Sequence, residues 1–509
     1  MSGSLWMPPG SHPDALPAVP RQRARPSWAH PDPVDELAER LDDFVAAAVH
    51  PDEIAALLES DGLSDDQIRE RYGVKDSFAL AEELYERVER RYPEPERPVH
   101  DPWQVGLLGC LLRGVVFALP GLGYVLGAPL LAGPEDDLGL PAGTVPLLAG
   151  ALVGWTWNQG LAHRAYFWLG LGDRGAARRS LLLGAPAGVL LGALVALAVA
   201  ATAATPHPAG AAFAAGQSCY LGAATVLLVM GRERVLLAAL TPMAAAAVFA
   251  QLHPVPDLAR GAVLLGSLLA VTALASLEVR PAVRDLGERG WTAGLTALLP
   301  FGGYGSAPRA QRTASPALTG SFPYALFGLG TGVLVLYAAL GDALADEGAG
   351  VVAAPAAVAL TLSMGPAEWL LHRFRSGSLA GLRSSSTPRA FRRTTVLTAV
   401  KCLTAYLAAL LALGLATSAL WPHAPSVAGV RLAGLLLLGV VLWTGLLLQS
   451  FGAVLSAAAV CCGAALAQTA ALVTHTGSPD GIGLVVHGTA AAAQAALVCA
   501  LLGRVTAHR

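Results

Sequence analysis

The sequence predicts an all-α, polytopic membrane protein with about 12 transmembrane helices in two pseudosymmetric six-helix lobes, preceded by a small soluble helical N-terminal domain. Hydrophobic residues make up 54% of the chain and charged residues only 14%. Its apolar stretches repeatedly reach the roughly 20 residues that cross a bilayer. The membrane segment is also duplicated, because His163-Arg164 recurs as His372-Arg373 about 209 residues later. Duplicated six-helix units occur mainly in transporters.

The N-terminal region divides into three parts. Residues 1–33 are rich in proline and lack the continuous apolar core of a signal peptide, so we expect a disordered tail. Residues 34–92 are acidic and predict short amphipathic helices at 35–49, 51–58, 67–72 and 77–92, with a Ser64-to-Gln67 capping box before the third. We expect a cytoplasmic helical domain that binds a cytoplasmic protein partner. A Pro-rich linker at 93–102 follows.

Twelve apolar segments then predict membrane spans. The first six form a lobe at 103–277 and the last six a lobe at 319–503, separated by a basic cytoplasmic loop at 278–318 and followed by a tail at 504–509. The spans are 103–131, 142–165, 180–204, 209–230, 233–252, 258–277, 319–340, 349–372, 395–418, 426–446, 448–473 and 481–503.

Charge in the loops predicts the orientation. With the N-terminus inside, the inner loops contain the arginines, whereas the outer loops are short and neutral or acidic, as at 135–137 and 342–347. Arginine-rich loops remain in the cytoplasm, so we expect a plasma-membrane protein with both termini cytoplasmic. An even number of helices gives both lobes the same orientation, about an axis along the membrane normal. The Ala/Gly/Arg bias is typical of a GC-rich bacterial genome.

The loop after the second span contains a local motif, Leu-Gly-Leu-Gly-Asp-Arg-Gly-Ala-Ala-Arg-Arg at 169–179. Its glycines allow a tight turn, Asp173 can cap the next helix, and its arginines suit an anionic inner leaflet. This motif and the six-plus-six arrangement over 103–503 resemble the multidrug/oligosaccharidyl-lipid/polysaccharide exporter superfamily. The resemblance implies a flippase for lipid-linked oligosaccharides in polysaccharide biosynthesis of the cell envelope.

The chain departs from this family in three respects. The second half has a Ser-rich insertion between Ser376 and Pro388 instead of the Gly-x-Gly-Asp turn. It also lacks the helices beyond twelve that many lipid-linked glycan flippases carry, and residues 34–92 lie outside the family's core. These departures concern the substrate more than the fold.

Ionisable residues inside the predicted spans are the main candidates for function, because a charge at bilayer depth usually faces a cavity or a partner. Arg113 is expected about ten residues into the first span, or roughly 15 Å deep. It is an anion ligand in a central cleft, a member of a buried ion pair or a residue that caps backbone carbonyls, and Pro120 can bend the same helix beyond it.

The duplicated His-Arg pairs lie at the inner ends of the second and eighth spans. They are either membrane anchors that snorkel or cleft ligands. Glu368 precedes His372 by four residues, which predicts a Glu-His pair on one helix face. Its repeat counterpart, Gln159, follows Asn158 beside two tryptophans, which predicts either a sugar-facing surface or an interfacial aromatic belt.

Lys401 is expected two turns from the inner face, where it either snorkels or reaches the cleft, whereas Arg431 and His487 lie in outer thirds of their spans. With Glu368 as the clearest acid, this set predicts a predominantly positive interior that attracts phosphate and repels cations. The predicted substrate-binding residues are Arg113, Asn158, Gln159, His163, Arg164, Glu368, His372, Arg373, Lys401 and Arg431.

The sequence lacks the motifs of several enzyme classes. It has no Walker A loop and no HExxH or Cys/His cluster, and its six cysteines lie in apolar segments without CxxC spacing. We expect no enzyme activity, cofactor, metal or nucleic-acid partner, and we expect membrane lipids and an anionic or lipid-linked saccharide as partners. Two alternatives remain: a non-transporting scaffold that recruits a partner through 34–92, and a membrane glycosyltransferase, although the latter usually has a large acidic loop.

Overall fold

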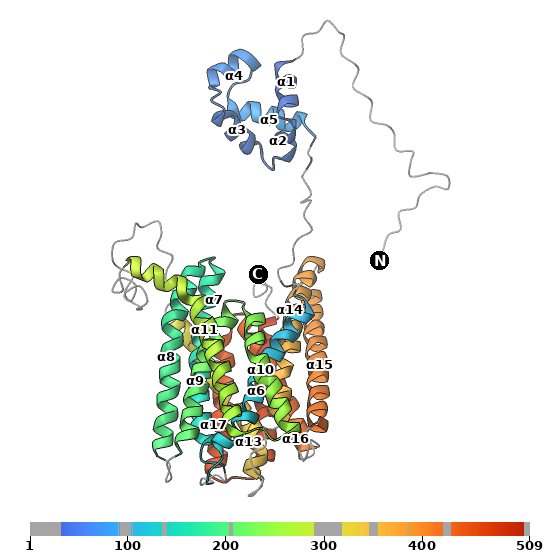
Figure 1. The fold of residues 1–509 in the computed structure, drawn as a ribbon. Coiled ribbons are helices and arrows are strands. Elements are labelled where there is room, and N and C mark those ends of the chain that lie inside the picture. The colour runs from blue at the N-terminus through green and yellow to red at the C-terminus, as the bar shows by residue number, and fades with distance from the viewer. Residues whose placement is uncertain are drawn as a thin grey trace, which may run out of the picture. The chain divides into compact units, whose positions relative to one another are not determined.

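The computed structural model describes residues 32–89, 91, 103, 105–134, 140–202, 207–289, 318–345, 355–385, 387–420 and 429–502. Every regular element that it describes is a helix. The chain divides into two compact units, residues 1–100 and 101–509 (Figure 1). The predicted tails, the linker and most of the loop at 278–318 lie outside the described residues.

The N-terminal unit has its own apolar core, which includes the fully buried Ile54, Leu80 and Leu84. The predicted capping box is confirmed, since Ser64 and Gln67 bond to each other's backbone N–H groups. The predicted helix at 35–49 is instead two helices that meet at Leu41. The helices are α1 (Pro33–Arg40), α2 (Asp42–Ala47), α3 (Pro51–Ser60), α4 (Asp65–Tyr72) and α5 (Ser77–Arg87).

The second unit contains twelve long helices in its described residues. Ten of them are long and apolar enough to cross a membrane, as expected for a polytopic membrane protein; α7 and α14 fall below the required hydropathy. The helices are α6 (Leu107–Leu131), α7 (Thr144–Gly170), α8 (Arg174–Ala201), α9 (Pro208–Val229), α10 (Glu233–Leu252), α11 (Asp257–Arg289), α13 (Leu318–Ala345), α14 (Pro355–Ser384), α15 (Pro388–Leu420), α16 (Val430–Ser450), α17 (Val454–Val473) and α18 (Pro479–Leu502).

Several helices continue beyond their predicted ends on the arginine-rich side, and α11, α14 and α15 extend the furthest. The last part of α11 occupies the start of the predicted loop at 278–318, and α14 continues through most of the predicted Ser-rich loop to Ser384. Helix α15 begins at Pro388, seven residues before the predicted span. Hydropathy marks where the hydrocarbon region ends, but backbone hydrogen bonding continues into the polar region because charged residues do not interrupt a helix.

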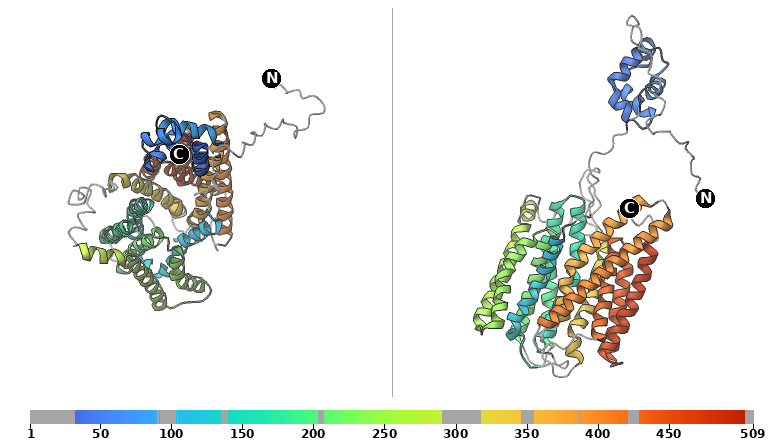
Figure 2. Two further views of the ribbon diagram at one scale, coloured as in Figure 1. Left: turned by 90° about the horizontal axis from the view of Figure 1, so that it is seen from above. Right: turned by 90° about the vertical axis from the view of Figure 1, so that its right-hand side faces the viewer.

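Two large, separate apolar clusters form most of the core of this unit, and a small third one joins α7, α8 and α9. Of the two large clusters, one comes from α6 to α11 and the other from α13 to α18, and Figure 2 shows these two sets of helices on opposite sides of the bundle. Equivalent helices pair in each set: α7 with α8 and α14 with α15, α6 with α10 and α13 with α17, α9 with α11 and α16 with α18.

Only two helix pairs account for most of the contact between the two sets. Helix α6 packs against α14, and α13 packs against α7. The first helix of each set therefore meets the second helix of the other set. The two helices with the lowest hydropathy, α7 and α14, are the ones that lie at this boundary.

The N-terminal unit should fold without the membrane helices, because its core is complete in itself. We expect a fragment of residues 32–91 to unfold cooperatively in denaturant. Replacing the buried Leu80 with Ala should lower its free energy of unfolding by about 2 to 5 kcal/mol, whereas Val49→Ala, at a 65% exposed position, should change it by less than about 0.5 kcal/mol. A fragment without a cooperative transition would contradict the prediction.

Candidate functional site

An ionic cluster joins the two sets of helices at the boundary between α6 and α14. The Arg113 guanidinium on α6 donates one hydrogen bond to Glu233 at 3.0 Å and another to Glu368 on α14. Glu233 is the first residue of α10. His372 lies one turn after Glu368, with Nε2 3.8 Å from the Glu368 carboxylate, which confirms the predicted pair. One cation therefore binds carboxylates from both sets.

Two glycines bring the backbones of α6 and α14 into contact beside this cluster. A Cβ atom on Gly365 would lie 2.7 Å from the Cys110 carbonyl oxygen, and one on Gly114 would lie 3.0 Å from the Gly365 nitrogen. Neither distance accommodates a methyl group without movement of the backbone. Because Gly114 follows Arg113 and Gly365 precedes Glu368 by three residues, this approach places the two charged side chains opposite each other.

The cluster lies closer to the end of its helix than the sequence predicted. Helix α6 begins at Leu107 rather than at residue 103, so Arg113 is six residues, or about 9 Å, from the helix end. Glu233 begins α10 at the same end of the bundle. The Arg113 side chain is 38% exposed. The structure agrees with the interpretation of Arg113 as a member of an ion pair, formed with Glu233 and Glu368.

The structure adds two carboxylates to the predicted set of mainly positive side chains. Arg113 is matched by two carboxylates, and Glu233 was missed because it stands at the very start of its predicted span, between the arginines at 232 and 234. Arg431 on α16 binds Asp480 on α18 at 3.0 Å. Lys401 is exposed beside Leu397 on the face of α15 opposite its buried residues. This position fits a snorkelling lysine and removes Lys401 from the substrate-binding set.

The second boundary, between α7 and α13, has neutral contacts at the corresponding positions. His163 on α7 hydrogen-bonds Ser321 at 3.1 Å and stacks on Tyr324 with ring centroids 3.8 Å apart. Gln159 packs against Gly328, where a Cβ atom would lie 2.5 Å from its Cγ. His163 and Gln159 thus occupy at this boundary the positions that His372 and Glu368 occupy at the other.

Asn158 does not share a surface with Gln159, contrary to the prediction. Gly154, one turn earlier on the same helix face, contacts Leu221 of α9, so Asn158 points into the first set of helices. It is 7% exposed, and its Oδ1 has no hydrogen-bond partner. Adjacent residues on a helix are about 100° apart, which explains why two polar neighbours face different partners.

The duplicated arginines also have different surroundings. Arg164 is 7% exposed and lies within the bundle. Its counterpart Arg373 is exposed and lies over the Trp369 ring, 5.3 Å from the centroid. The interpretation as a surface anchor therefore fits Arg373 and not Arg164.

Arginines from two of the arginine-rich loops bind one carboxylate. Arg178 on α8 and Arg232 before α10 both donate to Glu278 on α11, at 2.8 and 2.9 Å, so they do not simply face the lipid leaflet as predicted. The turn before α8 is confirmed, because the Asp173 carboxylate accepts a hydrogen bond from the Ala176 N–H at 2.7 Å and Gly172 has a φ of 78°. Among the described residues, no group of three His, Cys, Asp or Glu side chains could hold a metal ion.

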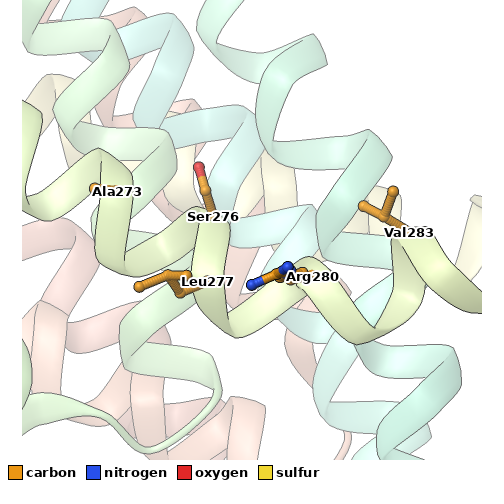
Figure 3. A pocket seen from close by; sticks show the side chains of 5 residues that line it. All are labelled: Ala273, Ser276, Leu277, Arg280 and Val283. Carbon is orange, nitrogen blue, oxygen red and sulfur yellow. The ribbon is translucent and has the colours of Figure 1, made fainter.

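A shallow depression lies elsewhere, on α11. Its lining residues are Ala273, Ser276, Leu277, Arg280 and Val283 (Figure 3). All five belong to one helix, and Leu277 is 58% exposed. The depression is therefore an outward-facing surface feature and not part of the boundary between the two sets of helices.

Comparison with known proteins gives no relative: no protein-family model matches the chain, and no curated protein matches its sequence. Function must therefore be inferred from the arrangement of residues described above.

The cluster predicts a clear order of stability among charge variants. Arg113→Ala leaves Glu233 and Glu368 near each other without their cation, so we expect a loss of about 1 to 3 kcal/mol and a lower melting temperature in detergent. Glu368→Gln in the same background should recover part of this loss because it removes the repulsion. Lys401→Ala is the matched control and should melt like wild type; equal melting of all four proteins would contradict the cluster.

Proposed function

We propose that the chain is a secondary transporter or flippase that moves a lipid-linked or anionic saccharide across the plasma membrane by alternating access. The observation that carries this proposal is the Arg113 cluster, which joins α6 and α10 to α14 across the boundary between the two sets of helices. A contact of this kind can close one end of a path between two bodies that move against each other.

The packing pattern supports the finer architecture in the proposal. Equivalent helix pairs occur in both sets. If α6 corresponds to α13 and α7 to α14, the contact of α6 with α14 is equivalent to the contact of α13 with α7. This pattern is expected of two six-helix lobes related by a pseudo-twofold axis. It agrees with the resemblance of residues 103–503 to the multidrug/oligosaccharidyl-lipid/polysaccharide exporter superfamily, which forms part of the proposal.

The low hydropathy of α7 and α14 supports twelve spans rather than ten. Both helices lie at the boundary between the lobes, where polar side chains can face a solvated path or a partner instead of lipid. Helices that line such a path need a less apolar sequence than helices that contact only lipid. We therefore count α7 and α14 among the transmembrane helices.

The cluster suggests how an anionic head group would open the inner end. Arg113 and Glu233 belong to one lobe and Glu368 to the other, so separation of the lobes breaks the bond between Arg113 and Glu368. A partly buried guanidinium that loses one anion is stabilised by another. Phosphate or pyrophosphate can take the place of Glu368, while Glu368 keeps His372 as its neighbour.

The neutral boundary offers contacts suited to a saccharide. Gln159, His163 and Tyr324 lie together where α7 meets α13. An amide, an imidazole and an aromatic ring provide hydrogen bonds and a flat apolar face, both of which sugars use. In the proposed cycle these side chains become accessible when the lobes separate.

Transport can be tested in liposomes with a fluorescent polyprenyl-pyrophosphate saccharide, scored by its exposure to an external quencher. We expect protein-dependent translocation that Arg113→Ala abolishes and Arg113→Lys partly retains, because lysine keeps the charge but not the two-sided hydrogen bonding. Lys401→Ala should translocate at the wild-type rate. Full activity of Arg113→Ala in folded protein would remove the cluster from the mechanism.

The acidic N-terminal unit favours a second candidate, a membrane scaffold that recruits a cytoplasmic protein. It has its own core and an excess of acidic side chains, as expected of a separate binding module. Deleting residues 34–91 distinguishes the candidates in the same liposome assay: we expect the transporter to retain translocation. A wild-type protein without translocation, whose cellular role is lost on this deletion, would support the scaffold.

A further inference from the structure

Helix α18 presents a line of polar side chains to the interior of the second set of helices. Asp480, His487 and Gln494 are spaced by seven residues, which places them on one helix face. Two of them have side-chain partners. Asp480 binds Arg431 on α16. Gln494 is hydrogen-bonded to Thr444 on α16 at 2.6 Å and to Cys461 on α17 at 3.2 Å. The line starts at the end of the bundle opposite the Arg113 cluster.

The middle of this line contains two polar atoms without partners. Nε2 of His487 and Oε1 of Gln468 on α17 are both buried and make no hydrogen bond. The two residues are only 4% and 6% exposed. Buried polar atoms are nearly always hydrogen-bonded, so two buried atoms without a protein partner on neighbouring helices indicate a place where a hydrogen-bond donor can bind.

There is room for a small ligand beside Gly483 on α18. A Cβ atom built on Gly483 would lie 3.7 Å from Gln468 Nε2 and 4.0 Å from His487 Cε1, with no other atom as close. These are ordinary van der Waals distances, so a group the size of a methyl or a water molecule fits between the two side chains.

The hydrogen bonds of His487 define what this ligand must be. Its Nδ1 lies 3.2 Å from the Gly434 carbonyl oxygen, which can only accept, so Nδ1 carries the hydrogen. In the neutral ring Nε2 is then an acceptor, as is the Gln468 amide oxygen. Two acceptors require a hydrogen between them, from a water molecule or from protonation of the ring.

We propose that Gln468, Gly483 and His487 form a buried proton-binding site, in which His487 Nε2 takes a proton from hydronium, releasing water, and donates the new N–H to Gln468 Oε1 directly or through one water. The inference rests on the proposed transport function and deepens it, because it names the proton as the coupling ion. The proton enters from the end of the bundle where α18 begins.

The surroundings suit a histidine that gains and loses charge. The Arg431 and Asp480 pair, two turns away, is neutral as a whole. Lys401 on α15 points outward. The other titratable side chains that are buried or partly buried on the described parts of α13, α15, α16 and α17 are Tyr324, Tyr337, Cys402, Tyr406, Cys461 and Cys462. None of them carries a formal charge at neutral pH.

Histidine NMR of the full-length protein in lipid nanodiscs tests the site directly. With ¹³C-labelled histidine, we expect a titrating ring resonance that is absent from His487→Gln and persists in the control His253→Gln, an exposed position. Gln468→Leu should lower its midpoint by about one pH unit, because the imidazolium loses its acceptor. If no titrating resonance disappears in His487→Gln, the proposal is overturned.

Gly483→Ala provides a variant with little risk of unfolding, since alanine favours a helix more than glycine does. Its methyl group occupies the space for water, so we expect it to shift the same midpoint downward. A midpoint unchanged in both Gly483→Ala and Gln468→Leu would show that His487 titrates elsewhere and would overturn the site.

Liposomes with an imposed pH gradient separate this inference from the transport proposal. One pH unit should accelerate wild-type translocation of the fluorescent saccharide up to about tenfold, and His487→Gln should lose this acceleration while keeping exchange without a gradient. An equal response in both proteins would overturn coupling through His487. A wild-type protein that titrates by NMR but translocates nothing would sustain the proton site and defeat the transport proposal.

Discussion

The bond between Arg113 and Glu368 depends on how closely two helices approach. Gly114 and Gly365 let the backbones of α6 and α14 touch, and beside this contact the Arg113 guanidinium binds Glu368 on the other helix while it also binds Glu233. The second boundary has a similar dependence, since Gly328 leaves space for Gln159. Small residues thus set the spacing of the two halves, and the polar side chains next to them determine what that spacing does.

The sequence predicted features that depend on residues close together in the chain. The capping box at Ser64, the cap at Asp173 and the pairing of Glu368 with His372 each involve residues within four positions of one another, and all are present. The existence of the long helices was equally accessible, because hydropathy over some 20 residues determines it. The ends of these helices could not be predicted in the same way. The thickness of the hydrocarbon region sets the length of the apolar stretch, but the helical hydrogen bonds can continue beyond it.

Long-range partners could not be predicted from the sequence. Glu233 is 120 residues from Arg113, and Asp480 is 49 residues from Arg431; nothing local to either arginine indicates its carboxylate. Both carboxylates stand at or next to the first residue of a helix, and the sequence analysis did not count such positions among the charges inside the spans. Asn158 shows a different limit: its polarity was evident, but the face it occupies depends on which neighbours α7 packs against.

The length of α14 has a mechanical consequence. From Glu368 the helix continues without a break to Ser384, a distance of about 24 Å, and it packs against α15. When a straight helix tilts about a fixed point, each residue moves in proportion to its distance from that point, so a tilt of α14 about Glu368 would displace Ser384 the most. The C-terminal end of α14 is on the same side of the bundle as the arginine-rich loops. A protein bound to this surface would therefore contact a helix end whose position depends on whether the bond between Arg113 and Glu368 is formed.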